Sequence, residues 1–214
     1  EVLYTIKMNT GKKAHWEKVY ETKEPHEVSW TQEFPKTSLE MIHSFPIDRS
    51  AKIIDVGGGD STLVDFLLEQ GFENITVLDI SAKALEKAKA RLGDRAQLVT
   101  WIMSDITQFQ PETTYDVWHD RAVFHFLTEE EQIEKYLNIA RKAAVGYLTI
   151  GTFSENGPEK CSGLAIKQYT EDTMSSVFAS DFETLTTKRE NHITPFATEQ
   201  NFVFCSFQRK TIKN

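Results

Sequence analysis

The stretch AKIIDVGGGDSTLVDFL, from Ala51 to Leu67, decides the fold class. Its first half is a short β-branched apolar run that ends in three glycines, Gly57–Gly59, as is typical of a buried parallel strand. In its second half, Leu63, Val64 and Leu67 are spaced as on one face of a helix. Glycine lets the backbone approach a ligand, and the free N–H groups of a helix N-terminus face it. The stretch therefore predicts a nucleotide-sized binding site.

The alternation of strand and helix continues beyond this stretch. Further short apolar runs predict strands, at residues 74–80, 97–105, 115–121 and 146–153. Capped amphipathic segments predict helices, at residues 38–45, 61–71, 81–93, 128–144 and 170–179, with Ser81 and Thr128 as N-caps. Such alternation requires a parallel sheet covered on both faces. Two β-rich segments, 182–191 and 201–210, have no helix between them and predict an antiparallel pair at the sheet edge. The predicted fold class is α/β: a Rossmann-like, doubly wound, seven-stranded, mostly parallel sheet with an antiparallel C-terminal strand.

Composition bounds the class of protein. The 214 residues, 40% hydrophobic and 26% charged, fit one globular domain with a terminal extension, and we divide them into an N-terminal lid or extension (1–50) and a binding domain (51–214). The net charge of −8 argues against a nucleic-acid partner, and no apolar run is long enough for a membrane span. Two cysteines form no disulfide framework and are too few for a Cys-rich zinc site. We expect a cytoplasmic protein without a metal site, as a monomer or weak dimer.

The residues around the glycines discriminate between ligands. A phosphate-binding P-loop needs Lys followed by Ser or Thr after its glycines, whereas Asp60 follows here. The dinucleotide fingerprint needs a third glycine where this chain has Thr62. Asp55 and Asp60 flank the turn, and acids there disfavour a pyrophosphate and favour a ligand that carries positive charge. S-adenosylmethionine, with its sulfonium and α-amino groups, fits this description.

IIDVGGGDS resembles motif I of the class I S-adenosylmethionine-dependent methyltransferases, written D/E-x-G-x-G, with Asp55, Gly57 and Gly59 at its defined positions. The resemblance covers about residues 51–210. It implies that Asp79, in VLDIS, holds the ribose hydroxyls and that Asp105, in IMSDI, meets the adenine amino group. YDVWHDR is similar to the fourth-strand motif of the family. The residues that follow the two acids, Ile80 and Ile106, would sandwich the adenine, with ordinary core packing as the alternative.

The acceptor site is expected beside the fourth and fifth strands, where the chain reads WHDRAVFHF. We take His119, Asp120, Arg121 and His125 as candidate catalytic residues. DRAVF resembles the aspartate–arginine turn of small-molecule thiol methyltransferases of the thiopurine type, and also the Asp-Lys-Gly turn of a class of lysine methyltransferases. The first resemblance implies that Arg121 holds a carboxylate or polarises a thiolate, and the second that Asp120 attracts an ammonium; the sequence leaves both open.

The aromatic N-terminal stretch HWEKVYETKEPHEVSW is similar to the W-x-x-x-Y…S-W lead-in of bacterial methyltransferases, which folds over the cofactor as a lid. Trp16, Tyr20 and Trp30 would then exclude water from the pocket. The alternative is that they attach an extra helix to the core. The sequence thus predicts a methyltransferase that uses S-adenosylmethionine, yields S-adenosylhomocysteine and acts on a small-molecule acceptor with an S, N or O nucleophile. A protein-lysine methyltransferase and a non-catalytic S-adenosylmethionine binder are the alternatives.

Overall fold

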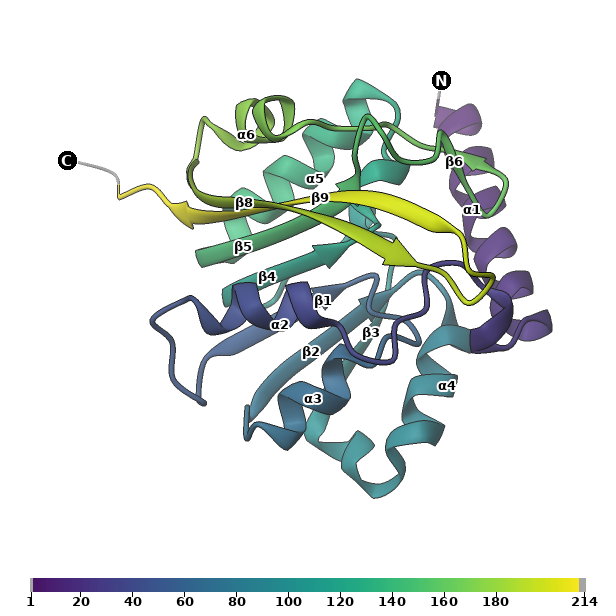
Figure 1. Ribbon diagram of the computed structural model, residues 1–214, viewed down its shortest axis with the longest axis horizontal. Helices are drawn as coiled ribbons and strands as arrows, with labels where there is room; N and C mark the ends of the chain where they lie inside the picture. Colours follow the sequence, from purple (N-terminus) through teal and green to yellow (C-terminus); the bar gives the residue numbers. More distant parts are fainter. Residues whose placement is uncertain (1, 212–214) are drawn as a thin grey trace.

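The sheet at the centre of the molecule has seven strands in the order β3-β2-β1-β4-β5-β9-β8 (Figure 1). The computed structural model describes residues 2–211, with side chains from Gly11 onward. The strands of the sheet are β1 (Lys52–Val56), β2 (Asn74–Asp79), β3 (Val99–Met103), β4 (Tyr115–Arg121), β5 (Ala144–Phe153), β8 (Phe182–Ile193) and β9 (Glu199–Arg209). The first five are mutually parallel, and β9 runs antiparallel to both β5 and β8. The predicted Rossmann-like α/β fold is confirmed.

Helices cover both faces of the sheet, because alternate residues of each strand point to opposite sides. One core lies under α2 (Lys36–His43), α3 (Leu63–Glu69) and α4 (Ala82–Leu92). The other lies under α5 (Glu130–Ala143) and α6 (Glu171–Phe178). On β4 the alternation is visible in neighbours: Val117 belongs to the first core and Trp118 to the second. The carboxyl ends of the parallel strands therefore open between two packed layers.

Helix caps agree with the sequence in one case and differ in another. The side chain of Ser81 accepts a hydrogen bond from the Ala84 N–H at 3.2 Å and begins α4, as predicted. The prediction that Thr128 caps the next helix is wrong. Glu129 occupies the N-cap of α5 and forms a reciprocal capping box with Gln132. Glutamate is an uncommon N-cap, whereas Thr before an acidic run is a common one, and this is why the sequence favoured Thr128. The observed start of α5 differs from the predicted start by one residue.

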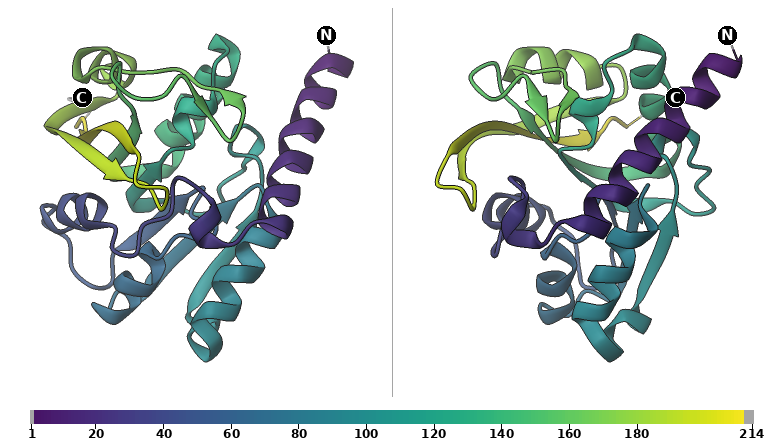
Figure 2. Two further views of the ribbon diagram at one scale, coloured as in Figure 1. Left: turned by 45° about the vertical axis from the view of Figure 1, so that its right-hand side comes forward. Right: turned by 90° about the vertical axis from the view of Figure 1, so that its right-hand side faces the viewer.

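The N-terminal region contains a helix that the sequence analysis left open. α1 (Val2–Thr22) stands beside α4 at the edge of the molecule, and η1 (Pro25–Glu27) leads from it toward α2 (Figure 2). Trp16 and Tyr20 both lie on this helix, so the extra helix of the alternative interpretation is present, and both residues also line the pocket described below. α2 itself packs into the first core through Leu39 and Ile42.

Short elements complete the chain around the strand ends. Three short 3₁₀ helices, η2 (Gly93–Leu98), η3 (Ile106–Gln108) and η4 (Phe124–Phe126), follow α4, β3 and β4. The loop after β5 contains a small hairpin of β6 (Lys160–Cys161) and β7 (Leu164–Ala165). None of the helices in residues 2–211 combines the length and apolar character that crossing a bilayer requires.

Candidate functional site

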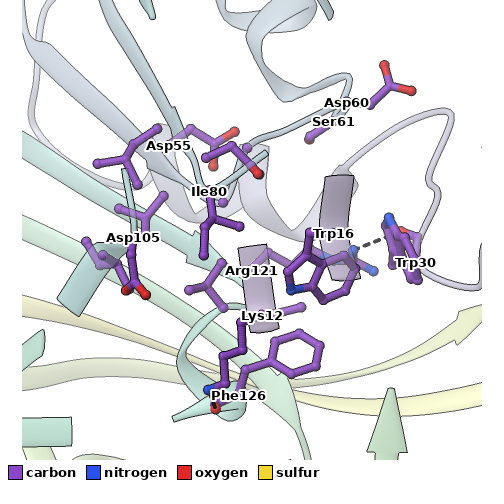
Figure 3. Close-up of a pocket in the computed structure, with 18 of the residues that line it drawn as sticks. Lys12, Trp16, Trp30, Asp55, Asp60, Ser61, Ile80, Asp105, Arg121 and Phe126 are labelled. Carbon is purple, nitrogen blue, oxygen red and sulfur yellow. Dashed lines mark hydrogen bonds between the residues drawn. The ribbon is translucent and has the colours of Figure 1, made fainter. Parts of the chain in front are cut away.

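A pocket lies at the carboxyl ends of β1, β2 and β4, beneath the C-terminal half of α1 (Figure 3). Its floor includes the glycine turn and the three acids that end the first strands, and its roof comes from α1, residues 28–32 and η4. Most of the residues expected from the sequence line it: Trp30, Asp55, Gly57, Asp79, Ile80, Asp105, Ile106, His119 and Arg121. Gly59, Asp120 and His125 lie outside its lining.

The glycine turn closes tightly over the end of β2. The N–H of Gly57 donates to the Leu78 carbonyl at 2.6 Å, and Gly57 and Gly59 have φ of +69° and +38°. A Cβ atom at Gly57 would lie 1.9 Å from Cγ2 of Val123. At Gly59 a Cβ atom would lie 2.8 Å from Oδ2 of Asp79. Glycine is therefore required at both positions, by backbone conformation and by space.

Asp60 contributes less negative charge to the pocket than the sequence indicated. Its carboxylate pairs with the guanidinium of Arg91, which also donates to the Ser61 carbonyl at 2.7 Å. This arginine on α4 holds the loop between the glycines and α3. The expected repulsion of a pyrophosphate thus depends mainly on Asp55 and Asp79.

Asp55 and His119 form a buried pair between β1 and β4. Nδ1 of His119 donates to Oδ1 of Asp55 at 2.7 Å, and Nε2 of His119 lies 2.8 Å from the Ser38 hydroxyl on α2. Oδ2 of Asp55 is buried and has no hydrogen-bond partner among the described residues. A buried carboxylate oxygen without a donor is unfavourable, so this atom is suited to a donor or cation supplied by a ligand.

Asp79 ends β2 and is almost fully buried. Burial raises its pKa to about 7, against the backbone hydrogen bond from Ser81 at 2.8 Å, and the nearby carboxylates of Asp55 and Glu17 raise it further. Tyr20 of α1 lies close above it, and burial followed by the charge of Asp79 raises the pKa of the tyrosine well above its usual value. Backbone donors therefore compensate the burial of Asp79 only in part, as expected for a carboxylate that hydroxyl groups of a ligand complete.

Asp105 follows β3 and begins η3. Its Oδ1 accepts hydrogen bonds from both the N–H and the hydroxyl of Thr107, at 2.8 Å and 2.7 Å. Ile80 lines the pocket half-buried, whereas Ile106 is buried and also belongs to the core under α5. Ile106 therefore packs in the core, as the alternative interpretation expected, and it also lines the pocket.

Asp120 faces the opposite side of the sheet from His119 and Arg121. Its Oδ1 accepts from the N–H groups of Val123 and Phe124, and its Oδ2 accepts from the Tyr136 hydroxyl at 2.8 Å. Burial raises its pKa to about 6. The carboxylate therefore organises the turn into η4, where Ala122 adopts a φ of +76°.

His125 is fully buried between Phe126 and Phe153. Its Nδ1 accepts the N–H of Phe153 at 3.2 Å. Burial, with a smaller contribution from Arg121, lowers its pKa to about 3, so its imidazole is neutral at physiological pH. It packs beside the site and does not reach the pocket.

Arg121 lies at the end of β4 with its guanidinium in the pocket wall. Its Nη1 donates to the Trp30 carbonyl at 3.0 Å, drawn as a dashed line in Figure 3, and its Cζ lies 4.6 Å from the centroid of the Phe202 ring. Cys161 of β6 lines the same pocket, and burial raises the pKa of its thiol to about 12. The thiol is therefore protonated and not a nucleophile at neutral pH.

The roof is held by aromatic packing and by polar ties from α1. The ring centroid of Trp16 lies 5.5 Å from that of Trp30 and 5.2 Å from that of Phe126. Lys12 Nζ donates to the Phe126 carbonyl at 2.9 Å, and His15 Nε2 lies 3.0 Å from the Ser162 hydroxyl. Lys12, Glu17 and Phe126 were not singled out from the sequence; the spacing of Lys12, Trp16 and Tyr20, every fourth residue, was the available signal of one helix face.

Within the described residues, no group of three or more His, Cys, Asp or Glu side chains could hold a metal ion. Both cysteines, Cys161 and Cys205, are free and buried. The charged and aromatic groups of the pocket are thus its carboxylates, the guanidinium of Arg121, the ammonium of Lys12 and its aromatic walls.

Comparison with known proteins assigns the domain. Residues 54–145 match the profile of a methyltransferase domain. The chain is 27% identical over 125 residues to the eEF1A lysine and N-terminal methyltransferase of Mus musculus, with 58% of this chain and 18% of that protein covered. It is 32% identical over 125 residues to the malonyl-[acyl-carrier protein] O-methyltransferase of Anoxybacillus flavithermus, with 56% of this chain and 47% of that protein covered. The chain thus spans less than half the length of either relative.

The fold comparison covers more of the chain. An S-adenosylmethionine-dependent methyltransferase from Anabaena variabilis superposes with a TM-score of 0.75 at 16% identity, over 95% of each chain. With 95% of this chain covered, only a small part of it lies outside the shared fold.

Proposed function

The chain belongs to the class I S-adenosylmethionine-dependent methyltransferases, and from this premise we propose that it binds S-adenosylmethionine in the pocket under α1 and methylates a small-molecule acceptor. The single observation that carries the cofactor part is the unpaired, buried Oδ2 of Asp55 beside the glycine turn. An α-ammonium group placed there would complete the carboxylate, whereas a phosphate would be repelled.

The other acids fit the same cofactor. Asp79, a buried carboxyl whose pKa is raised, suits a pair of ribose hydroxyls. Asp105 keeps Oδ2 for an exocyclic amino group because Thr107 takes Oδ1. Gly57 and Gly59 leave room for the backbone to approach the ligand.

When bound, the cofactor supplies a methyl group on a sulfonium, already activated for transfer. The residues of this chain would then position the reactants and exclude water. Trp16 and Trp30 line the pocket, and an aromatic face beside a sulfonium contributes cation–π attraction of about 0.5–2 kcal/mol. His119 orients Asp55 from the side of β4. Asp120 and His125 have no atom in the pocket lining, so we assign them to the support of the η4 turn.

The covered pocket favours a small acceptor over a protein segment. α1 is tied to η4 through Lys12, to the β6–β7 hairpin through His15, and to α4 through Glu17. A protein substrate would require this roof to open. The names of the relatives include both a protein-lysine enzyme and one whose acceptor is carried on a carrier protein, so the test must separate the classes.

Calorimetry with S-adenosylmethionine tests the cofactor, and we expect binding that Asp79→Ala weakens at least about tenfold. Unchanged affinity in that variant would remove the ribose assignment. Labelled S-adenosylmethionine then tests the acceptor, with panels of thiols, amines, carboxylates and denatured lysate protein. Label in low-molecular-weight products supports the proposal, and label in protein alone supports the lysine methyltransferase alternative. Tight binding with no transfer in any panel supports the non-catalytic binder.

A further inference from the structure

Two of the three nitrogen atoms of the Arg121 guanidinium are unused. Nη1 donates to the Trp30 carbonyl, but Nε and Nη2 are buried and have no hydrogen-bond partner among the described residues. Nε and Nη2 lie on the same edge of the planar group, and their N–H bonds point in parallel. A buried donor without an acceptor is unfavourable by about 1–3 kcal/mol, and more when it is charged. The Nε–Nη2 edge of the Arg121 guanidinium therefore lacks an acceptor, which a ligand could supply.

No carboxylate of the described chain neutralises this cation. Arg121 forms no salt bridge within residues 11–211, and the neighbouring Asp120 gives its oxygens to Val123, Phe124 and Tyr136. Glu190, whose charge opposes the effect of burial on Arg121 most strongly, accepts a hydrogen bond from the amide of Gln32 at 2.9 Å. Burial accordingly lowers the pKa of Arg121 to about 10. The charges of Glu190, Cys161 and Asp55 raise this pKa, but by less than burial lowers it. Arg121 remains charged at neutral pH and uncompensated.

The geometry points to an anionic acceptor, and we propose that the methyl acceptor is a carboxylic acid whose carboxylate binds side-on to Nε and Nη2 of Arg121. The inference rests on the proposed function and narrows its substrate class. Two parallel N–H donors in one plane match the two oxygens of a carboxylate, which is the geometry of bidentate arginine pairs. The other cation of the pocket, Lys12, already donates to the Phe126 carbonyl and offers no such edge.

The same edge disfavours the competing acceptor classes. An ammonium beside Arg121 would meet a like charge in a partly desolvated pocket. A neutral acceptor without a hydrogen-bond acceptor at this place would leave both buried donors unpaired, and its affinity would be much lower for that reason. The apolar surroundings from Trp30, Phe126 and Phe202 strengthen the attraction for an anion by excluding water.

Binding of simple carboxylates tests this assignment without an activity readout. The protein, saturated with S-adenosylhomocysteine, is titrated with acetate, malonate, benzoate and phenylacetate, and with phenylacetamide and 2-phenylethylamine as matched neutral and cationic probes. Tryptophan fluorescence reports binding, because Trp16 and Trp30 line the same pocket as Arg121. We expect phenylacetate to bind at least about tenfold more tightly than its amide or amine.

Variants at Arg121 test whether its Nε–Nη2 edge binds the carboxylate. Arg121→Gln should weaken the carboxylate at least about thirtyfold, and Arg121→Lys, which keeps the charge but not the planar fork, at least about tenfold. Arg141→Gln is the matched control, since Arg141 lies at the far end of α5 and pairs with Asp181. The affinity for S-adenosylhomocysteine in each variant shows that the pocket is folded.

The outcomes separate this inference from the proposed function. Failure of the wild-type protein to bind S-adenosylhomocysteine contradicts the proposed function itself. Normal binding of S-adenosylhomocysteine without binding of any carboxylate, acetate included, overturns the inference alone. Carboxylate binding that Arg121→Gln and Arg121→Lys leave unchanged overturns it as well.

Discussion

The carboxylate of Glu17 in α1 accepts a hydrogen bond from the backbone N–H of Ala82 at 2.9 Å, and so the roof of the pocket caps the first turn of α4. The same carboxylate accepts from the Lys83 N–H at 3.1 Å and the Ser81 hydroxyl at 3.0 Å. A carboxylate at a helix N-terminus is stabilised by the unpaired N–H groups and by the helix dipole. α4 begins at Ala82, three residues after Asp79, so one glutamate links the roof to the turn that follows the proposed ribose-binding acid.

Glu17→Ala is expected to loosen the roof. Loss of this cap should lower the free energy of unfolding by about 0.5–2 kcal/mol and speed the dissociation of S-adenosylmethionine by a similar energetic margin, about two- to thirtyfold. Stopped-flow dissociation with tryptophan fluorescence measures the second effect. Glu21→Ala, an exposed acid one turn later on α1, is the matched control. Identical dissociation rates in the two variants would show that α1 does not retain the cofactor.

Gly57→Ala is expected to destabilise the chain for two separable reasons. The left-handed φ of +69° destabilises a non-glycine residue by about 1–2 kcal/mol. The new methyl group would also collide with Val123, and overpacking of this kind lowers the free energy of unfolding by about 1–3 kcal/mol. Urea unfolding of the apo protein measures the sum.

Two further variants separate the reasons. Val123→Ala in the Gly57→Ala background should recover the collision part and leave the backbone part. Gly71→Ala, with a φ of +83° and no atom within 4 Å of its new Cβ, should show the backbone part alone. A Gly57→Ala cost no larger than that of Gly71→Ala would contradict the close approach of η4 to the glycine turn.

Tyr136→Phe is expected to affect stability and not cofactor binding. Its hydroxyl donates to Oδ2 of Asp120 and accepts from Nε1 of Trp118, so its removal leaves two buried polar groups unpaired at a cost of about 1–3 kcal/mol or more. Thermal unfolding measures the loss. Because this network faces the core under α5, the affinity of the folded protein for S-adenosylmethionine should stay within about twofold. A large loss of affinity for S-adenosylmethionine at unchanged stability would indicate that Asp120 contributes to the binding site.

The sequence predicted the sheet well because β1, β2 and β3 are short apolar runs that end at, or just before, a glycine or an acid. Asp55, Asp79 and Asp105 reach the pocket wall simply because the carboxyl ends of parallel strands share one edge. Asp120 and His125 could not be placed in the same way. Strand alternation sends Asp120 to the face opposite His119 and Arg121, and the turn after it decides where His125 points.

The sequence left α1 open for a different physical reason. Between Gly11 and Thr22 its sequence lacks a continuous apolar stripe, and much of the helix surface is exposed. Long-range polar ties, from Lys12 to η4 and from Glu17 to α4, hold it in place. Contacts between residues more than sixty positions apart leave no local signal in a sequence.

The raised pKa of Asp79 predicts that cofactor affinity depends on pH. In the free protein, burial together with the charges of Asp55 and Glu17 raises the pKa of this carboxyl to about 7, so below that pH most molecules carry a protonated Asp79. Ribose hydroxyls donate to the ionised form and stabilise it, so the pKa falls on binding. Binding near neutral pH therefore releases a proton, and affinity should decrease as the pH falls, by up to about tenfold per unit below 7. Calorimetry of S-adenosylhomocysteine binding in two buffers of different ionisation enthalpy counts the protons released.

Asp79→Asn isolates this carboxyl from the other acids that face the pocket. The amide retains an acceptor oxygen and the shape of the side chain but cannot ionise near pH 7. The variant should bind S-adenosylhomocysteine more weakly than the wild type at pH 8, and its affinity should be nearly constant between pH 6 and pH 8. A variant that keeps the wild-type pH profile would assign the titration to another group of the pocket, and proton uptake on binding in place of release would reverse the sign argued for Asp79.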